Sequence, residues 1–281
     1  MKFGLCQELF GERSWDDQCR TMADLGYHGV EIAPFTLAPL VTGISQERRR
    51  ALRETTQRHG LEVIGLHWLL AKTEGFHLTT RDRDVRRATS AYFVALAHCC
   101  ADLGGKILVL GSPQQRNLEP GTTMSEALDH AEEVLCGALP TCEERGVTIA
   151  FEPLTKKETD FINTCAEACA LIDRIDHPHL RLHQDVKAML GAESEDLPTL
   201  ITKYAEKTVH FHANDTNLLG PGMGETDFAP IFEALLKSGY DGYVSVEVFD
   251  DSPGADHIAQ VSIATMTSAL DAARRRRSTS R

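Results

Sequence analysis

The segment TIAFEP, residues 148–153, is a short apolar run that carries an acidic residue, Glu152, near its end. Three later segments repeat this arrangement, with a polar side chain near the C-terminal end of a strand-like run. They are LRLHQD (180–185), VHFHAND (209–215) and YVSVEV (243–248). The carboxyl ends of parallel strands meet at one face, which is where such folds bind ligands. We therefore expect one mouth of a parallel β structure to collect Glu152, Asp185, His212 and Glu247.

Strand-like runs alternate with helix-like segments along the whole chain. We expect strands at residues 2–7, 29–34, 62–68, 106–112, 148–153, 180–185, 208–215 and 242–248. Helices are expected near 14–25, 45–59, 82–103, 124–145, 164–175, 195–205, 227–237 and 256–272, several of them opened by a Ser, Thr or Asp cap. Eight strand–helix units in about 270 residues predict an α/β fold, a single (β/α)8 TIM barrel.

The barrel is expected to occupy residues 1–272 as one domain, because no linker or change of composition divides the chain. Residues 273–281 end in RRRRSTSR, a basic run without an apolar side chain to bury. We expect these residues to form a solvated, disordered tail.

Composition narrows the class of protein. The formal net charge is −12, which argues against a nucleic-acid partner, because binding to phosphates depends on clustered Lys and Arg. Glu8 and Glu12 interrupt the N-terminal stretch where a signal peptide would be apolar, and no window approaches 18 uncharged apolar residues. We therefore expect a cytoplasmic protein without a membrane partner. The eight cysteines form no zinc-type C-x-x-C pair and are expected to be reduced and mostly buried.

Three carboxylates and one imidazole form an oxygen-rich donor set. Such a set suits Mn²⁺, Mg²⁺ or Co²⁺ better than a structural zinc ion, and Mn²⁺ is our first expectation. One carboxylate at a strand end is commonly a helix cap or an ion-pair partner. However, Glu152 and Glu247 lie inside apolar runs, where an unpaired carboxylate is costly to bury without a cation. From opposite sides of the mouth, these two glutamates could flank a substrate carbon and exchange its proton.

Four segments resemble the sugar isomerase/epimerase family with a xylose-isomerase-like barrel, which includes D-tagatose 3-epimerase and related ketose 3-epimerases. The segments are FEPLTKKETDFINT (151–164), LHQDVKAM (182–189), HFHANDTNLLGPGMGETDF (210–228) and GYVSVEVF (242–249). The resemblance runs from the first strand to the last helix. It implies that the metal ligands are Glu152, Asp185, His212 and Glu247, and that both glutamates act as the acid/base pair at C3 or C2. It also implies that Glu158 binds substrate oxygens.

The chain departs from the family around the substrate. The family places a His three residues after the aspartate ligand, where this chain has Ala188. An Arg usual after the histidine ligand is absent, and ANDTN offers Asn214 and Asn217 instead. GSPQQRN replaces an aromatic residue after the fourth strand and leaves Gln114 near the mouth. The reaction class therefore transfers better than the identity of the substrate.

Other side chains are candidates for substrate binding. Lys187 could bind a carboxylate, a phosphate or a developing enolate, or it could be a solvated loop lysine. His67 could donate a hydrogen bond or simply fill the core, and Trp68 could form an apolar wall. His183 and His210 are expected one layer deeper, as satisfied residues that orient the ligands. The expected substrate contacts are Glu158, His67, Trp68, Lys187, Gln114, Asn214 and Asn217.

Three enzymatic functions remain open. The first is a metal-dependent isomerase or epimerase that acts on a sugar or sugar derivative through an enediolate. The second is a metal-dependent lyase or dehydratase acting on a keto-sugar or keto-inositol. An apurinic-site endonuclease is a remote third, because such enzymes need more metal ligands and a basic groove. A binding module without activity would have no use for the two glutamates. The resemblance also implies a homodimer or homotetramer.

Overall fold

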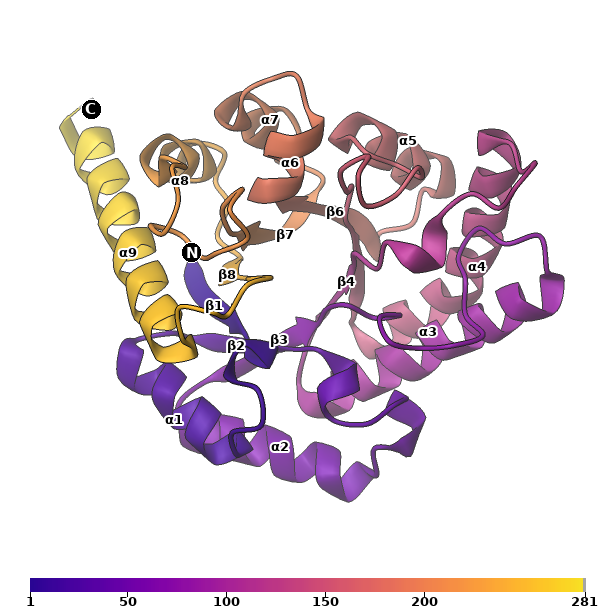
Figure 1. Cartoon of the computed structure of the whole chain (residues 1–281), viewed down its shortest axis with the longest axis horizontal. Helices are drawn as coiled ribbons and strands as arrows, with labels where there is room; N and C mark the ends of the chain where they lie inside the picture. Colours follow the sequence, from indigo (N-terminus) through magenta and orange to yellow (C-terminus); the bar gives the residue numbers. More distant parts are fainter. Residues whose placement is uncertain (280–281) are drawn as a thin grey trace.

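A computed structural model describes residues 1–279 as a closed barrel of eight parallel strands surrounded by helices (Figure 1). The strands follow one another around the ring in chain order, and β1 closes the ring by pairing with β8. The strands are β1 (Lys2–Cys6), β2 (Gly29–Ile32), β3 (Glu62–Leu66), β4 (Ile107–Leu110), β5 (Thr148–Phe151), β6 (Leu180–Asp185), β7 (Thr208–Ala213) and β8 (Tyr243–Val246). This confirms the predicted TIM barrel.

The helices begin where the sequence provides caps. Ser14, Ser45 and Asp82 each accept a hydrogen bond from a backbone N–H of the helix that they open. Thr123 and Thr164 form capping boxes with the glutamates three residues later. The helices are α1 (Trp15–Leu25), α2 (Gln46–Arg58), α3 (Arg83–Leu103), α4 (Met124–Arg145), α5 (Cys165–Ile175), α6 (Val186–Ala192), α7 (Leu197–Lys203), α8 (Phe228–Lys237) and α9 (Ala255–Thr279). Short 3-10 helices occupy η1 (Gln7–Phe10), η2 (Pro34–Thr36), η3 (Val41–Gly43) and η4 (Gln114–Arg116).

Two helices differ from the sequence-based expectation. Helix α6 was not predicted, and it forms because Asp185 accepts a hydrogen bond from the backbone N–H of Ala188 (2.7 Å). Helix α9 continues to Thr279, although we expected a disordered tail from residue 273. Ala273 is buried, and Arg276 forms an ion pair with Glu233 on α8 (3.1 Å). These contacts give the basic segment a surface to pack on; residues 280 and 281 lie outside the described residues.

Apolar side chains of the strands pack against those of the surrounding helices. They form one continuous hydrophobic core around the barrel. Strands β3 and β4 approach closely at Gly65, where a Cβ atom would lie 2.0 Å from the carbonyl oxygen of Ile107. All eight cysteines are free thiols, and only Cys136 among them is exposed. Among residues 1–279, no helix combines the length and hydrophobicity needed to cross a membrane.

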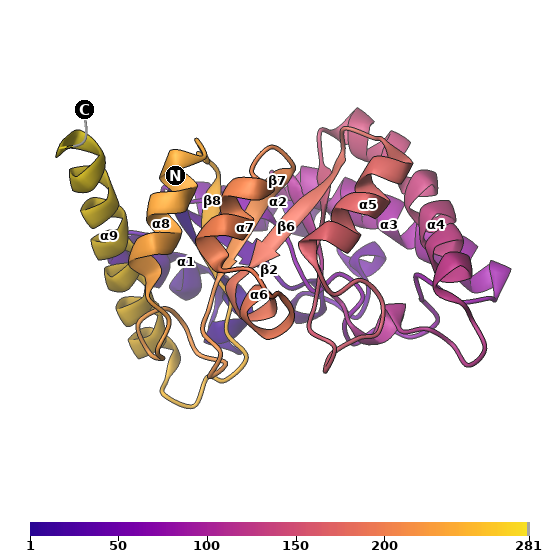
Figure 2. The ribbon, with the colours of Figure 1, turned by 90° about the horizontal axis from the view of Figure 1, so that it is seen from above.

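The two ends of the barrel differ in the length of their connections. Figure 2 shows the barrel from the side, with the long segments that follow the strands, including α6 after β6, gathered along its lower edge. Parallel strands all point to this face, so side chains at their carboxyl ends converge there. The site is therefore built at this end.

Candidate metal centre and active site

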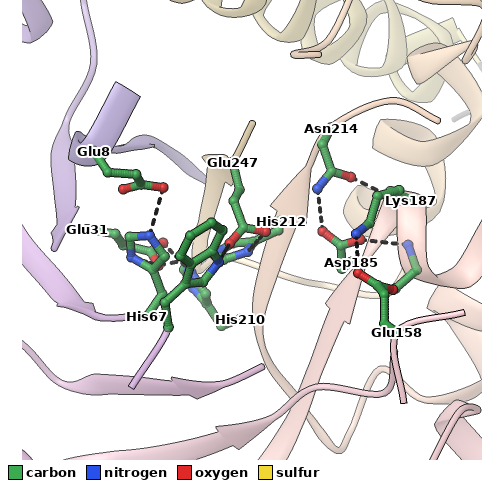
Figure 3. A network of polar contacts seen from close by, with 12 residues as sticks. Glu8, Glu31, His67, Glu158, Asp185, Lys187, His210, His212, Asn214 and Glu247 are labelled. Carbon is green, nitrogen blue, oxygen red and sulfur yellow. Dashed lines mark hydrogen bonds and ion pairs between the residues drawn. The ribbon is translucent and has the colours of Figure 1, made fainter. Parts of the chain in front are cut away.

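The structure brings the four sequence-predicted metal ligands together. Glu152 and Glu247 directly follow β5 and β8, Asp185 ends β6, and His212 lies on β7. Their exposed fractions are 4%, 2%, 1% and 0%, respectively. Donor atoms of Glu152, Asp185 and His212 lie within 4.8 Å of one another. Glu247 lies outside this group but contacts it through His212, with Glu247 Oε2 3.2 Å from His212 Nδ1 (Figure 3).

His183 is a further nitrogen donor at this centre. It lies two residues before Asp185 on β6, and its donor atom is within 4.8 Å of those of Glu152, Asp185 and His212. We expected a satisfied residue, but both ring nitrogens are buried without a hydrogen-bond partner in the described chain. Its ring centroid lies 4.2 Å from that of His212. An orphaned, fully buried imidazole beside carboxylates fits a metal site.

The acids at the centre repel one another. Burial, followed by the charges of Glu247 and Asp185, raises the pKa of Glu152 well above its usual value. Burial and the charge of Glu247 raise the pKa of Asp185 to about 6. Burial also opposes ionisation of Glu247, but the charge and hydrogen bond of His212 outweigh it and lower its pKa. A buried set of three carboxylates with imidazoles beside them fits a divalent cation, whose charge would relieve this repulsion.

Glu31 on β2 orients the histidines and was missed by the sequence analysis. Its Oε2 lies 3.0 Å from His212 Nε2, and its Oε1 bonds to His210 Nε2 (Figure 3). Burial works against its charge, but the charges of His210 and His212 outweigh burial and hold the pKa of Glu31 well below its usual value. A proton on His212 Nε2 leaves Nδ1 available to a metal. The signal was an acid inside the apolar run GVEIAP, as for Glu152.

Asn214 holds Asp185, a candidate ligand, and does not line the cavity. Its Nδ2 donates to Asp185 Oδ2 (2.6 Å), and its Oδ1 accepts from the backbone N–H of Lys187 (2.9 Å). The backbone N–H of Ala188 donates to the other oxygen, Oδ1, so both carboxylate oxygens of Asp185 accept a hydrogen bond. The sequence predicted a substrate contact here, whereas the side chain is fully buried beside Asp185 and does not line the cavity.

A cavity of about 300 Å³ opens beside the two glutamates. Of the predicted substrate contacts, Trp68, Gln114, Glu158 and Lys187 line it. His67 and Asn217 do not. His67 is fully buried with Nε2 3.0 Å from Glu8, and Asn217 donates to the carbonyl of Met223 in an exposed loop.

Lys187 and Glu158 form a donor–acceptor pair on the cavity wall. Lys187 Nζ lies 2.7 Å from Glu158 Oε1 and 4.0 Å from the centroid of the Phe249 ring. Lys187 belongs to the first turn of α6, so it is not a loop residue. Burial opposes the charge of Glu158, but the hydrogen bond and charge of Lys187 outweigh it and lower its pKa. Both groups therefore face the cavity in charged form.

Arg116 binds the backbone just after β5. Its guanidinium is buried, and Nη1 donates to the carbonyl oxygen of Glu152 (2.8 Å). Burial lowers its pKa to about 10, while the charges of Glu152 and Glu158 oppose that change. Its charge thus favours the anionic form of both acids.

Comparisons with known proteins agree with this architecture. The chain is 25% identical over 235 residues to ketose 3-epimerase of Arthrobacter globiformis, covering 83% of this chain and 78% of that protein. It is 25% identical over 253 residues to 3-dehydro-D-guloside 4-epimerase of Escherichia coli K12, covering 88% and 92%. The crystal structure of D-psicose 3-epimerase with D-tagatose from Clostridium cellulolyticum H10 superposes with a TM-score of 0.84, at 21% identity and with 96% and 99% of the chains covered. A family model described as Xylose isomerase-like TIM barrel matches residues 19–269, and the chain therefore belongs to that family.

Proposed function

We propose that the protein is a divalent-metal-dependent epimerase or isomerase that acts on a sugar or a sugar derivative. The observation that carries the proposal is a pair of buried glutamates that line one cavity, with Glu152 in a group of possible metal donors and Glu247 in contact with His212 of that group. The names of the relatives, which are sugar epimerases, support the same reaction class.

The two glutamates transfer the proton. One carboxylate removes a proton from the carbon beside the substrate carbonyl, which gives an enediolate, and the other returns a proton to that carbon or its neighbour. Both acids line the cavity and come from strands separated by β6 and β7. They can therefore approach a bound carbon from different directions. Return on the other face gives an epimer, and return at the neighbouring carbon gives an isomer.

The residues that would hold the cation are Glu152, Asp185, His212 and Glu247, and a donor atom of His183 lies within 4.8 Å of those of Glu152, Asp185 and His212. A divalent cation held there supplies positive charge beside the substrate oxygens and favours the enediolate anion. The majority of oxygen donors makes Mn²⁺ our first choice, followed by Mg²⁺ and Co²⁺.

The polar side chains that line the cavity indicate the chemical class of the substrate. Lys187 offers a cationic donor, Glu158 an anionic acceptor and Gln114 an amide, and all three line the cavity. Such groups bind hydroxyl and carbonyl oxygens. The relatives differ in the sugar that their names give, a ketose in one and a 3-dehydro-guloside in the other. We therefore propose a small sugar or sugar derivative.

The test is a screen of keto-sugars, aldoses, inososes and sugar acids in D₂O with added Mn²⁺, followed by NMR. We expect metal-dependent deuterium incorporation at one carbon, without loss of a fragment. Replacing Glu152 or Glu247 by Gln should slow exchange by about 10²-fold or more. The exposed Glu144 on α4 provides the control, and E144Q should exchange at the wild-type rate. Full exchange in both site variants would contradict the mechanism, and release of a fragment would indicate elimination instead.

A further inference from the structure

The indole of Trp68 holds one oxygen of Glu247. Trp68 Nε1 donates to Glu247 Oε1 at 2.6 Å, whereas Glu247 Oε2 lies 3.2 Å from His212 Nδ1. The two oxygens of this carboxylate therefore have different neighbours. Oε2 faces the donor set, and Oε1 is held by Trp68, whose side chain lines the cavity.

The backbone of Trp68 adopts an unusual conformation. Its φ angle is +52°, in the left-handed region that bulky residues rarely occupy. The residue follows β3, where the N–H of His67 still donates to the carbonyl of Ile32 (3.1 Å). The N–H of Ala71 then donates to the carbonyl of Trp68 (3.1 Å), which closes a turn. Such backbone strain persists where the surroundings fix it and is concentrated at functional positions.

Aromatic rings on both sides fix the indole. The Phe35 ring lies 5.8 Å from it, and the Phe249 ring lies 5.9 Å from it in a stacked arrangement. Two ammonium groups cover the outer rings, with Lys72 Nζ 4.0 Å from the centroid of Phe35 and Lys187 Nζ 4.0 Å from that of Phe249. Rotation of Trp68 would disrupt ring contacts on both sides. The N–H donor is therefore preorganised.

We propose that Trp68 is a positioning residue for Glu247. Its N–H keeps Oε1 at the cavity while Oε2 remains with the donor set, so that one defined oxygen meets the substrate proton. Without this donor, the carboxylate can rotate about its last side-chain bond, which has a broad torsional preference. Productive alignment would then be populated only part of the time. The inference rests on the proposed function in one respect, namely that Glu247 transfers a proton.

A matched pair of variants separates positioning from packing. W68F removes the N–H and keeps a ring, whereas F35L weakens the ring contact and keeps the N–H; Phe35 does not line the cavity. We expect W68F to lower kcat by about tenfold to a hundredfold with KM within about twofold of wild type. F35L should lower kcat less than W68F does, because it loosens one ring contact and keeps the N–H donor. An increase in KM alone for W68F, or an equal loss in F35L, would overturn the proposal.

A spectroscopic measurement tests the contact without a substrate. Ultraviolet resonance Raman of the Mg²⁺-loaded protein reports hydrogen bonding of the indole N–H, and subtraction of the W68F spectrum isolates Trp68 from Trp15. We expect a strongly bonded N–H in the wild type and a shift to a weakly bonded position in E247A. An N–H band that is unaffected in E247A would refute the contact. This result stands even when the substrate screen finds no activity, so failure of the proposed function is distinguishable.

Discussion

Gly111 lies so close to Glu152 that a Cβ atom built on its backbone would stand 1.7 Å from Glu152 Oε2. Gly111 directly follows β4, and Glu152 directly follows the neighbouring strand β5. The carboxylate occupies the space that any other residue at position 111 would fill. The donor set therefore depends on a missing side chain as well as on its ligands.

The variant G111A should displace the Glu152 carboxylate while the barrel still folds, because the clash involves the end of one side chain. We expect affinity for Mn²⁺ to fall by about tenfold or more, as measured by calorimetric titration. The control is G43A, whose Cβ would lie 3.9 Å from the Ala38 Cβ, an ordinary contact. Equal affinities in the two variants would show that Glu152 does not bind the metal as oriented here.

Metal binding should stabilise the protein more at high pH. Burial and Glu247 raise the pKa of Asp185 from 3.8 to about 6, so the metal-free fold loses stability as pH rises through this range. Below pH 6 protons also compete with the cation for this carboxylate. The increase in Tm caused by Mn²⁺ should therefore be larger at pH 7.5 than at pH 5, by scanning calorimetry. D185N should reduce this dependence, with Glu152 accounting for what is left, and an increase in Tm independent of pH in the wild type would contradict the expectation.

Loss of the Asn214 side chain should weaken the metal site without changing the cavity wall. Asn214 donates to Asp185 Oδ2 at 2.6 Å. We expect N214A to lower Mn²⁺ affinity by about tenfold to a hundredfold, as partners of metal ligands commonly do. N217A, in the exposed loop, is the matched control and should bind as the wild type does. The role of Asn214 is disproved if both variants bind equally.

Lys187 should affect substrate binding and not metal binding. K187M removes the charged donor that faces the cavity and leaves Glu158 without its 2.7 Å partner. Loss of a charge-assisted hydrogen bond should raise KM by about tenfold or more, with Mn²⁺ affinity unchanged. K203M serves as the control, because Lys203 pairs with Glu195 on the surface around α7. A KM that stays at the wild-type value in K187M would exclude the contact.

The sequence predicted the barrel and the approximate position of each candidate ligand, because these features depend on local periodicity and on strand ends. The contact of Glu31 with His210 and His212 could not be predicted in this way. All four residues of β2 are buried, so alternation does not identify the inward face, and the register shifts between Val30 and Glu31. A register shift arises from strand pairing, which the local pattern does not reveal.

Helix α6 and the turn at Trp68 were missed for different reasons. Helix α6 has only seven residues and contains Gly191, which lowers helix propensity. Its formation depends on a cap that is also a predicted metal ligand, Asp185. The left-handed backbone of Trp68 has no sequence signature, because the rings that fix it come from distant segments. The assignment of substrate contacts remains a prediction.

Glu31 links two distant strands of the barrel in addition to its effect on the tautomer of His212. It belongs to β2, whereas His212 belongs to β7, and β1 and β8 separate these strands around the ring. Its bond spans the interior and joins the half of the barrel without cation ligands to the half that carries them. Separation of β1 from β8 would pull this brace away from His212. A cation bound at the candidate site should therefore be held less tightly once β1 separates from β8.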